Sequence, residues 1–400
     1  MDAIVVPDFI AFTLGMIVYF IGAGLTRRYA LLRNFNIPEP VSGGLAVAIV
    51  VWIAHLASGR EITFELETRD VLLTLFFTTI GLNARFSELL RGGRPLAILL
   101  ALTLAFMVLQ NLVGLFGVTA FGLPAASAVL VGSASLIGGH GTAIAWGPEI
   151  AALGVDGAAE MGIAAATVGL ILAALVGGPI ARLLIERRKL TPRDEDADHI
   201  VGVANESGDA PKFGYVALMH TLLTANVAMI AGYVINLQIA AMGVKLPLFV
   251  PCLIMGILIA NLQPLLLPKL PGVTGTPVLA LVSDFTLSVF LSMSLMSMKL
   301  WTLAGLAGPL FAVLGAQVVL TVAFTVFVLF PAMGATYRAA VLAAGFGGFA
   351  LGATPTAIAN MTAVTKRYGP APVAFIILPL VSAFFVDIAN AFIIQLFASL

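Results

Sequence analysis

Long runs of apolar residues constrain this chain more than any other feature of its sequence. A run of about 20 apolar residues is long enough for an α-helix to cross a hydrocarbon core of about 30 Å. Strands of a membrane barrel would instead show short segments of alternating hydrophobicity. We interpret as transmembrane helices the ten runs 8–26, 38–57, 69–86, 95–117, 159–181, 214–237, 247–266, 284–302, 308–330 and 372–397. The sequence therefore predicts an all-α polytopic membrane protein whose surroundings are a lipid bilayer.

The composition excludes several other classes of protein. Of 400 residues, 60% are hydrophobic and 10% charged, against about 45–50% and about 25% in a typical soluble domain. Lys and Arg number 20, as do Asp and Glu, so no basic surplus points to a nucleic-acid partner. The single cysteine, Cys252, excludes a disulfide framework.

Two further apolar stretches, 125–146 and 338–361, differ from the ten runs. They are crowded with Gly, Ala, Ser and Thr, and Gly or Pro stands near their middles, where a straight helix would break. We interpret both as re-entrant hairpins, which dip into the membrane and return to the same side. Non-helical backbone at that depth is tolerated where protein buries it or where it lines a wet cavity. The alternative is two ordinary spanning helices.

The distribution of basic residues favours the hairpin interpretation. Cytoplasmic loops carry an excess of Lys and Arg. If the N-terminus is outside and neither hairpin crosses, Arg60, Arg69, Lys245 and Lys299 lie outside, and the other 16 of the 20 basic residues lie inside. A full crossing by either stretch would reverse every later loop and weaken this bias. Both termini are therefore expected on the outer side of the membrane.

Several features recur at an offset of 214 residues. Asp70 and Asp284 each open an expected span, and Pro95 corresponds to Pro309. The tetrapeptide Thr-Ala-Ile-Ala occurs at 142–145 and again at 356–359. The register is kept across both segments with the order of spans preserved, which favours an internal repeat.

The repeat predicts two inverted halves, 1–185 and 213–400. Each half holds five spans and one hairpin, and because five is odd the second half is upside down relative to the first. This is the inverted-repeat architecture of secondary transporters. Between the halves lies a polar segment, 186–212, rich first in charged residues and then in Gly, Asn and Ser. We interpret it as a flexible cytoplasmic linker.

The hairpin tips are the first candidates for a binding site. Glycine lets the backbone approach a ligand closely. Helix-terminal N–H groups suit a carboxylate, whereas C=O groups with Ser, Thr and Asn oxygens suit Na⁺. Alternatively, the small residues only allow close helix packing. The candidate tip residues are Ser133, Ser135, Gly138, Gly139, His140, Gly141 and Thr142 in the first hairpin, and Gly352, Thr354, Thr356 and Asn360 in the second.

Two titratable residues carry separate hypotheses. His140 could bind a substrate carboxylate, relay a proton, or cap hairpin carbonyls without meeting substrate. Asp387 is expected in the middle of a span, where an unpaired carboxylate is costly and a functional role is the default. It could bind Na⁺ or a substrate amino group, with Asn390 on the same helical face, or form a structural pair. Asp70 and Asp284 are expected to stand at helix starts.

Several segments together resemble the bacterial sodium/glutamate symporter family. They are IPEPVSGGL, LFFTTIGLNA, the GGHGT tip, GLILAALVGGPIAR, AAVLAAGFGGF followed by LGATPTAIANM, and AFFVDIANAFII. The match keeps its order along almost the whole chain. The resemblance departs at three positions: Gly is usual where this chain has Ala350, and His and Cys are usual where it has Phe346 and Gly347.

The resemblance implies Na⁺-coupled uptake of L-glutamate through a homodimer in the bacterial inner membrane, with no enzymatic activity. We expect alternating access, with substrate and Na⁺ bound where the two tips meet. The expected substrate ligands are Ser135, Gly138, Gly139, His140, Gly141, Thr142, Thr354, Thr356, Asn360 and Asp387. The expected Na⁺ ligands are Ser133, Gly352, Thr354, Asp387 and Asn390.

Three alternatives remain open at this stage. A symporter for another small carboxylate, driven by Na⁺ or H⁺, would use the same tips. An intramembrane enzyme could use Asp284 with Asp387, but no Gly-x-Gly-Asp motif surrounds either residue. Ser133 or Ser135 with His140 would give a poor nucleophile–base geometry within one hairpin. A channel would not accumulate its substrate against a gradient.

Overall fold

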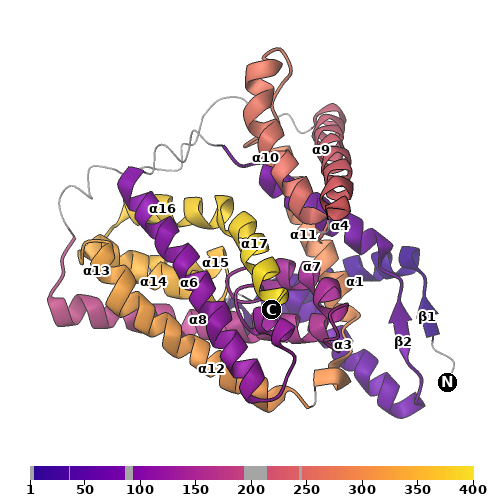
Figure 1. Ribbon diagram of the computed structural model, residues 1–400, viewed down its shortest axis with the longest axis horizontal. Helices are drawn as coiled ribbons and strands as arrows, with labels where there is room; N and C mark the ends of the chain where they lie inside the picture. Colours follow the sequence, from indigo (N-terminus) through magenta and orange to yellow (C-terminus); the bar gives the residue numbers. More distant parts are fainter. Residues whose placement is uncertain (1–3, 36, 86–92, 193–213, 243–245, 304) are drawn as a thin grey trace.

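Helices make up nearly all of the regular structure of this protein (Figure 1). The computed structural model describes residues 4–35, 37–85, 93–192, 214–242, 246–303 and 305–400. Two short strands, β1 (Ile4–Val6) and β2 (Ile62–Phe64), pair in parallel. Most of the expected linker, from residue 193 to 212, lies outside the described residues.

The helices of the first half follow the expected order. They are α1 (Asp8–Arg28), α2 (Ala30–Asn34), α3 (Glu39–Ser58), α4 (Glu67–Leu82), α6 (Gly93–Ala120), the 3₁₀ helix η1 (Ala125–Val131), α7 (Gly139–Ala151) and α8 (Ala158–Arg188). Glu39 begins α3 and Asp70 lies in the first turn of α4, as expected for acidic residues near a helix N-terminus.

The second half of the chain is also helical. Its helices are α9 (Tyr215–Ala241), α10 (Phe249–Leu266), α11 (Pro277–Met296), the short η3 (Leu300–Leu303), α12 (Ala307–Phe324), α14 (Tyr337–Leu351), α15 (Thr354–Tyr368), α16 (Pro372–Phe384) and α17 (Val386–Ala398). A π-helical turn, η4 (Thr325–Leu329), and α13 (Phe330–Ala332) continue α12 to its end.

The described residues contain eight helices long and apolar enough to cross a membrane. The bent pair α16 and α17 makes a ninth span if it is counted as one. The one remaining expected span, 69–86, corresponds to α4, which has 16 residues. At 1.5 Å per residue it is about 24 Å long, shorter than a bilayer core of about 30 Å.

Two expected spans differ in detail from the structure. The span expected at 284–302 is α11, which begins at Pro277, and Thr276 caps it by accepting from the Leu279 N–H. Asp284 therefore lies inside the helix, and its expected place at a helix start is wrong. The span expected at 372–397 bends by 44° near residue 385, between α16 and α17.

Both Gly-rich stretches are broken where their glycines predict a break. In the first, non-helical residues 132–138 separate η1 from α7. In the second, Gly352 and Ala353 separate α14 from α15. Neither stretch forms one straight helix.

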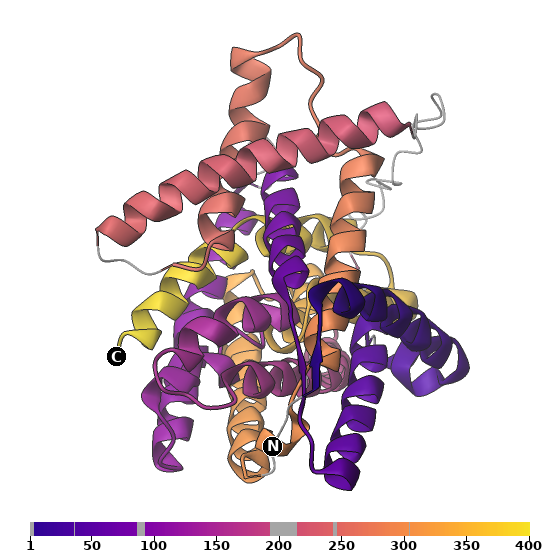
Figure 2. The same cartoon turned by 90° about the vertical axis from the view of Figure 1, so that its right-hand side faces the viewer.

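The helices pack as two bundles (Figure 1). The scaffold bundle, as we call it, contains α1, α3, α4, α9, α10 and α11, which pack on one another. Figure 2 shows α9 as a long rose-coloured rod across this bundle, where it contacts α10 and α4. The broken-helix bundle contains α6 to α8, η1, α12 and α14 to α17. Contacts of α7 with α11 and of α17 with α10 join the two bundles.

Small residues bring scaffold helices unusually close together. A Cβ built on Gly22 of α1 would lie 1.8 Å from the Glu39 carbonyl O of α3, and a Cβ on Gly81 of α4 would lie 2.2 Å from the Leu253 carbonyl O of α10. Neither position accepts a larger residue without separating the helices. Such close packing by small residues stabilises helix pairs in membranes, where the hydrophobic effect between helices is absent.

Candidate functional site

The first break is built around a turn that only glycine suits well. α7 begins at Gly139, whose φ of +71° lies in the left-handed region. Residues with a Cβ rarely adopt this conformation, whereas glycine does so without steric cost. Gly139 therefore lets the chain leave the non-helical segment and enter α7 directly.

Two asparagines from other helices hold this non-helical segment. Asn111 of α6 accepts from the Ser133 N–H at 2.8 Å and donates through Nδ2 to the Ser133 Oγ at 2.9 Å. Asn390 of α17 donates through Nδ2 to the Ser133 carbonyl O at 2.9 Å. Every polar group of Ser133 is thus engaged, and Ser133 anchors the break. Its role as a Na⁺ ligand stays a prediction.

The second break presents a helix N-terminus without a side-chain cap. α15 begins at Thr354, and the preceding Ala353 has no side-chain oxygen that could accept from the first turn. α7 likewise has no side-chain cap. The first N–H groups of a helix have no partner within it. Both breaks therefore offer N–H groups and a partial positive charge to an anionic ligand.

The two breaks lie against each other. A Cβ on Gly139 would lie 3.7 Å from the Gly352 carbonyl O. A Cβ on Gly138 would lie 2.8 Å from Nδ2 of Asn390. The structure thus brings together the two hairpin tips and α17. No side chain fits between Gly138 and Asn390, which explains the need for glycine there.

Three predicted site residues carry buried oxygens with no hydrogen-bond partner. They are Ser135 Oγ, Thr356 Oγ1 and Asn390 Oδ1. Buried polar atoms are nearly always paired, so each such oxygen calls for an explanation. Hydroxyl and amide oxygens are ligands that hard cations such as Na⁺ accept.

The His140 side chain makes its hydrogen bond with α8. Its Nε2 lies 3.0 Å from Thr167 Oγ1, and that hydroxyl donates its hydrogen to the Ile163 carbonyl O at 2.8 Å. The imidazole must therefore donate from Nε2 to Thr167. The partner is a hydroxyl of α8 and not a carbonyl of the first break, so this bond differs from the capping role expected for His140. Its role as a substrate ligand stays a prediction.

The remaining predicted tip residues have packing neighbours. Asn360 Nδ2 donates to the Ala173 carbonyl O of α8 at 3.0 Å, which fixes α15 against α8. A Cβ on Gly141 would come within 3.6–3.8 Å of the Phe77, Phe290 and Phe76 rings of the scaffold bundle. Thr142 is buried. The Asn360 amide group therefore has a structural partner, and its role as a substrate ligand stays a prediction.

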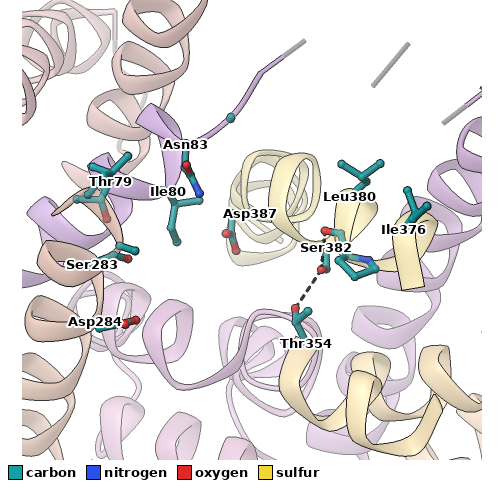
Figure 3. A pocket seen from close by; sticks show the side chains of 14 residues that line it. Thr79, Ile80, Asn83, Ser283, Asp284, Thr354, Ile376, Leu380, Ser382 and Asp387 are labelled. Atoms are coloured by element: carbon teal, nitrogen blue, oxygen red, sulfur yellow. Dashed lines mark hydrogen bonds between the residues drawn. The ribbon is translucent and has the colours of Figure 1, made fainter. Parts of the chain in front are cut away.

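A cavity of about 760 Å³ opens beside the second break and has walls from both bundles (Figure 3). The scaffold wall presents Thr79, Asn83, Ser283 and Asp284, from α4 and α11. The other wall presents Thr354, Ser382 and Asp387. Thr354 Oγ1 donates to Ser382 Oγ at 3.0 Å, and Asp387 points into the space between the walls. Among the described residues, no basic side chain lines this cavity.

A second cavity, of about 370 Å³, lies at the opposite ends of α4 and α11. Its walls include Ile144 and Gly147 of α7, Glu160 of α8, and Arg69 and Lys299. The Lys299 Nζ pairs with Glu61, and its backbone N–H donates to Glu160 Oε1 at 3.2 Å. The ammonium of Lys299 holds the pKa of the Glu61 carboxyl below its ordinary value. These contacts tie the scaffold loop at Glu61 to α8.

Sequence reasoning missed the scaffold wall of the first cavity. Asp284 was expected to cap a helix, and Thr79, Asn83 and Ser283 drew no attention. The pair Thr276–Pro277 is a helix-start signal, because Thr is a good N-cap and Pro suits the first helical position. This signal moves the start of α11 and places Asp284 about two turns inside the helix.

The described residues contain no group of three or more His, Cys, Asp or Glu side chains that could hold a metal ion. A transition-metal site is therefore not suggested in this part of the chain. Na⁺ has no such requirement, because carbonyl, hydroxyl and amide oxygens suffice for a hard cation.

Comparison with known proteins gives one consistent family. The family model described as sodium/glutamate symporter matches residues 7–370. The sodium/glutamate symporter of Haemophilus influenzae is 40% identical over 385 residues, which cover 96% of this chain and 95% of that protein. The sodium/glutamate symporter of Escherichia coli K12 is 39% identical over 382 residues, covering 95% and 94%.

Among solved structures, a sodium proton antiporter from Methanocaldococcus jannaschii aligns over 98% of this chain and 96% of its own. The sequence identity is 16% and the TM-score 0.43. This likeness is too distant to inform the site. The family match and the two bacterial relatives carry the assignment: the chain is a membrane transporter, not an enzyme, and belongs to the sodium/glutamate symporter family.

Proposed function

We propose that this protein couples the entry of Na⁺ to the uptake of L-glutamate across the bacterial inner membrane by alternating access. The names of the relatives supply the two solutes. One structural observation carries the proposal: two uncapped helix N-termini meet at Gly139 and Gly352 beside a cavity walled by both bundles.

The two breaks give each solute a fitting partner. The N–H groups at the start of α15, together with Thr354, would bind a glutamate carboxylate, because a helix N-terminus favours anions. The unpaired oxygens of Asn390 and Thr356 would bind Na⁺. Asp387 would supply the negative charge for the ion or for the substrate amino group. The other predicted ligands, from Ser135 to Thr142, would act from the first break.

An inverted repeat is part of this proposal, and the element boundaries support it. α6 begins at Gly93 and α12 at Ala307, which is 93 + 214. α8 begins at Ala158 and α16 at Pro372, which is 158 + 214. The contacts between the halves are also equivalent. At this offset α3 corresponds to α10 and α4 to α11, and α3 contacts α11 just as α10 contacts α4. The two breaks would then be re-entrant hairpins entering from opposite sides.

Alternating access would move the broken-helix bundle against the scaffold bundle. The two cavities support this, because each is bounded on one side by α4 or α11 and on the other by the bundle that holds the breaks. With both termini outside and the 186–212 linker in the cytoplasm, the larger cavity faces the cytoplasm.

We also propose a homodimer formed through the early spans of each half. α1 and α9 expose many large apolar side chains, among them Phe9, Phe20, Leu223 and Ile230. Light scattering of the detergent-solubilised protein, corrected for bound detergent, would give the mass of two chains if the proposal holds and of one chain if it fails.

Uptake of radiolabelled L-glutamate into proteoliposomes tests the function. We expect accumulation with an inward Na⁺ gradient and none when K⁺ replaces Na⁺. Accumulation on a proton gradient alone would contradict Na⁺ coupling. Competition by amine-free dicarboxylates, with no loss in an Asp387→Asn variant, would make another small carboxylate the substrate. Absence of uptake from folded, inserted protein would contradict the proposal as a whole.

A further inference from the structure

Two glutamines deep in the broken-helix bundle donate to the backbone of the two breaks. Gln110 of α6 and Gln317 of α12 are both fully buried. Gln110 Nε2 donates to the Ala350 carbonyl O at 2.6 Å. Gln317 Nε2 donates to the Val131 carbonyl O at 3.0 Å. None of the motifs discussed above contains either glutamine.

Both accepting carbonyls belong to the last turn of the helix that precedes a break. Val131 is the last residue of η1, and Ala350 is the next to last residue of α14. The final carbonyls of a helix have no partner within it. They also carry the negative end of the helix dipole. The glutamine amides thus supply donors where the interrupted helices lack them.

The two amides act across the halves of the chain. Gln110, in the first half, holds the break of the second, and Gln317, in the second half, holds the break of the first. Gln317 Nε2 also donates to the Gln110 backbone O at 2.7 Å, so the two holding points are joined directly. The supports of the two breaks therefore belong to one hydrogen-bond network.

The same side chains are unfavourable for packing alone. The Oε1 atoms of Gln110 and Gln317 are both buried without a hydrogen-bond partner. An unpaired buried acceptor is costly, and an apolar side chain of the same shape would avoid that cost. The donors must therefore be needed for something other than filling the interior.

We propose that Gln110 and Gln317 are positioning residues that hold the two breaks in one relative geometry, so that ions and substrate bind at a preformed meeting point of the tips. The inference rests on the proposed Na⁺-coupled transport and deepens it. Neither side chain need touch a solute, since each acts through a backbone carbonyl next to a break.

The variants Gln110→Met and Gln317→Met test the inference, because Met keeps a similar volume and length and removes the donor. Gln263→Met is the matched control: Gln263 Nε2 also donates to backbone carbonyls, those of Leu270 and Pro271, but far from the breaks. Na⁺ and glutamate half-saturation concentrations would be measured in proteoliposomes, and melting temperatures in detergent.

We expect each Gln→Met change at 110 and 317 to raise the half-saturation concentration for Na⁺ roughly two- to tenfold, the equivalent of one lost hydrogen bond. Gln263→Met should leave it unchanged. Lower melting temperatures with unchanged half-saturation concentrations would show a merely structural role and overturn the inference. If the unsubstituted protein itself shows no Na⁺-dependent uptake, the proposed function fails instead.

Discussion

The two cavities bounded by α4 and α11 share walls but differ in charge and closure. The larger one, of about 760 Å³, is lined by Asp284 and Asp387 and by no basic residue from the part of the chain that the structure describes. The smaller one, of about 370 Å³, includes Arg69, Glu160 and Lys299. At the smaller cavity Lys299 contacts both Glu61 and Glu160. The larger cavity is thus an open acidic space. At the smaller cavity, polar contacts link the scaffold bundle to the broken-helix bundle.

The alternating access that we propose predicts such a difference for either one of its two states. Because α4 and α11 bound both cavities, sliding the broken-helix bundle along them would widen one cavity as it narrows the other. The open acidic side is suited to exchanging cations with the solution. The other side would be held shut by contacts that the second state has to break.

The largest effect is expected from removing the charge at the acidic cavity. Asp387→Asn should lower the rate of Na⁺-driven uptake about 10- to 100-fold, since an interaction with a charged group contributes about 1.5–3 kcal/mol. Asp284→Asn is the matched control on the facing wall. Its side chain is exposed, so we expect less than about a fivefold loss. Equal losses in both variants would contradict a site centred on the breaks.

A smaller effect is expected from the backbone of the first break. Gly139→Ala forces an alanine into a left-handed conformation, which costs about 1–2 kcal/mol. Uptake should fall about 5- to 30-fold if that conformation places the start of α7 for binding. Gly24→Ala, on α1 with nothing near its added Cβ, serves as the control and should transport normally. Full activity of Gly139→Ala would show that binding does not depend on the left-handed turn at Gly139.

The smallest effect is expected at the closed side. Glu61 and Lys299 are each about 40% exposed, and an exposed ion pair contributes only about 0.2–1 kcal/mol. Glu61→Gln should therefore shift the balance between the two states by at most about fivefold, and added salt should reduce the difference. The readout is the labelling rate of a cysteine introduced at Ser297, in the wall of the smaller cavity. An equal rate with Glu61 and with Gln at position 61 would show that the pair does not hold this side.

The pH dependence of this pair has a definite sign. Lys299 holds the pKa of Glu61 below its ordinary value, so the folded state binds this proton less readily than the unfolded state. The pair's contribution is fully present above the ordinary carboxyl pKa and is lost as the pH falls through the lowered value. The labelling rate of a cysteine introduced at Ser297, divided by that of a free thiol at the same pH, should therefore rise on acidification when Glu61 is present, and less so in Glu61→Gln.

Hydropathy predicted the helical spans because a helix in lipid must satisfy its own backbone groups. The two breaks were also predictable, since glycine clusters such as 138–141 disfavour a continuous helix. Hydropathy could not place the helix ends. Pro277 and the bend near residue 385 depend on capping and tertiary packing, which an apolar run does not record.

The site was predicted in part. Composition pointed to the hairpin tips, and Gly139 and Gly352 do lie together. The hydrogen bonds of His140 to Thr167 and of Asn360 to Ala173 could not be foreseen, because each partner lies on a helix remote in sequence. The buried glutamines of α6 and α12 gave no signal either, since a single Gln in a span does not reveal which carbonyl it reaches.

Cysteine accessibility tests the central claim, the exchange of the two cavities, most directly. The native Cys252 is buried, so Ser283→Cys and Ser297→Cys each introduce one reactive thiol, in the larger and in the smaller cavity. Labelling by a membrane-impermeant maleimide would be measured in oriented vesicles with and without Na⁺ and glutamate. The account predicts that ligands raise one labelling rate and lower the other. It also predicts that the reagent reaches the two positions from opposite sides of the membrane. Rates that rise or fall together, or labelling of both positions from one side, would contradict it.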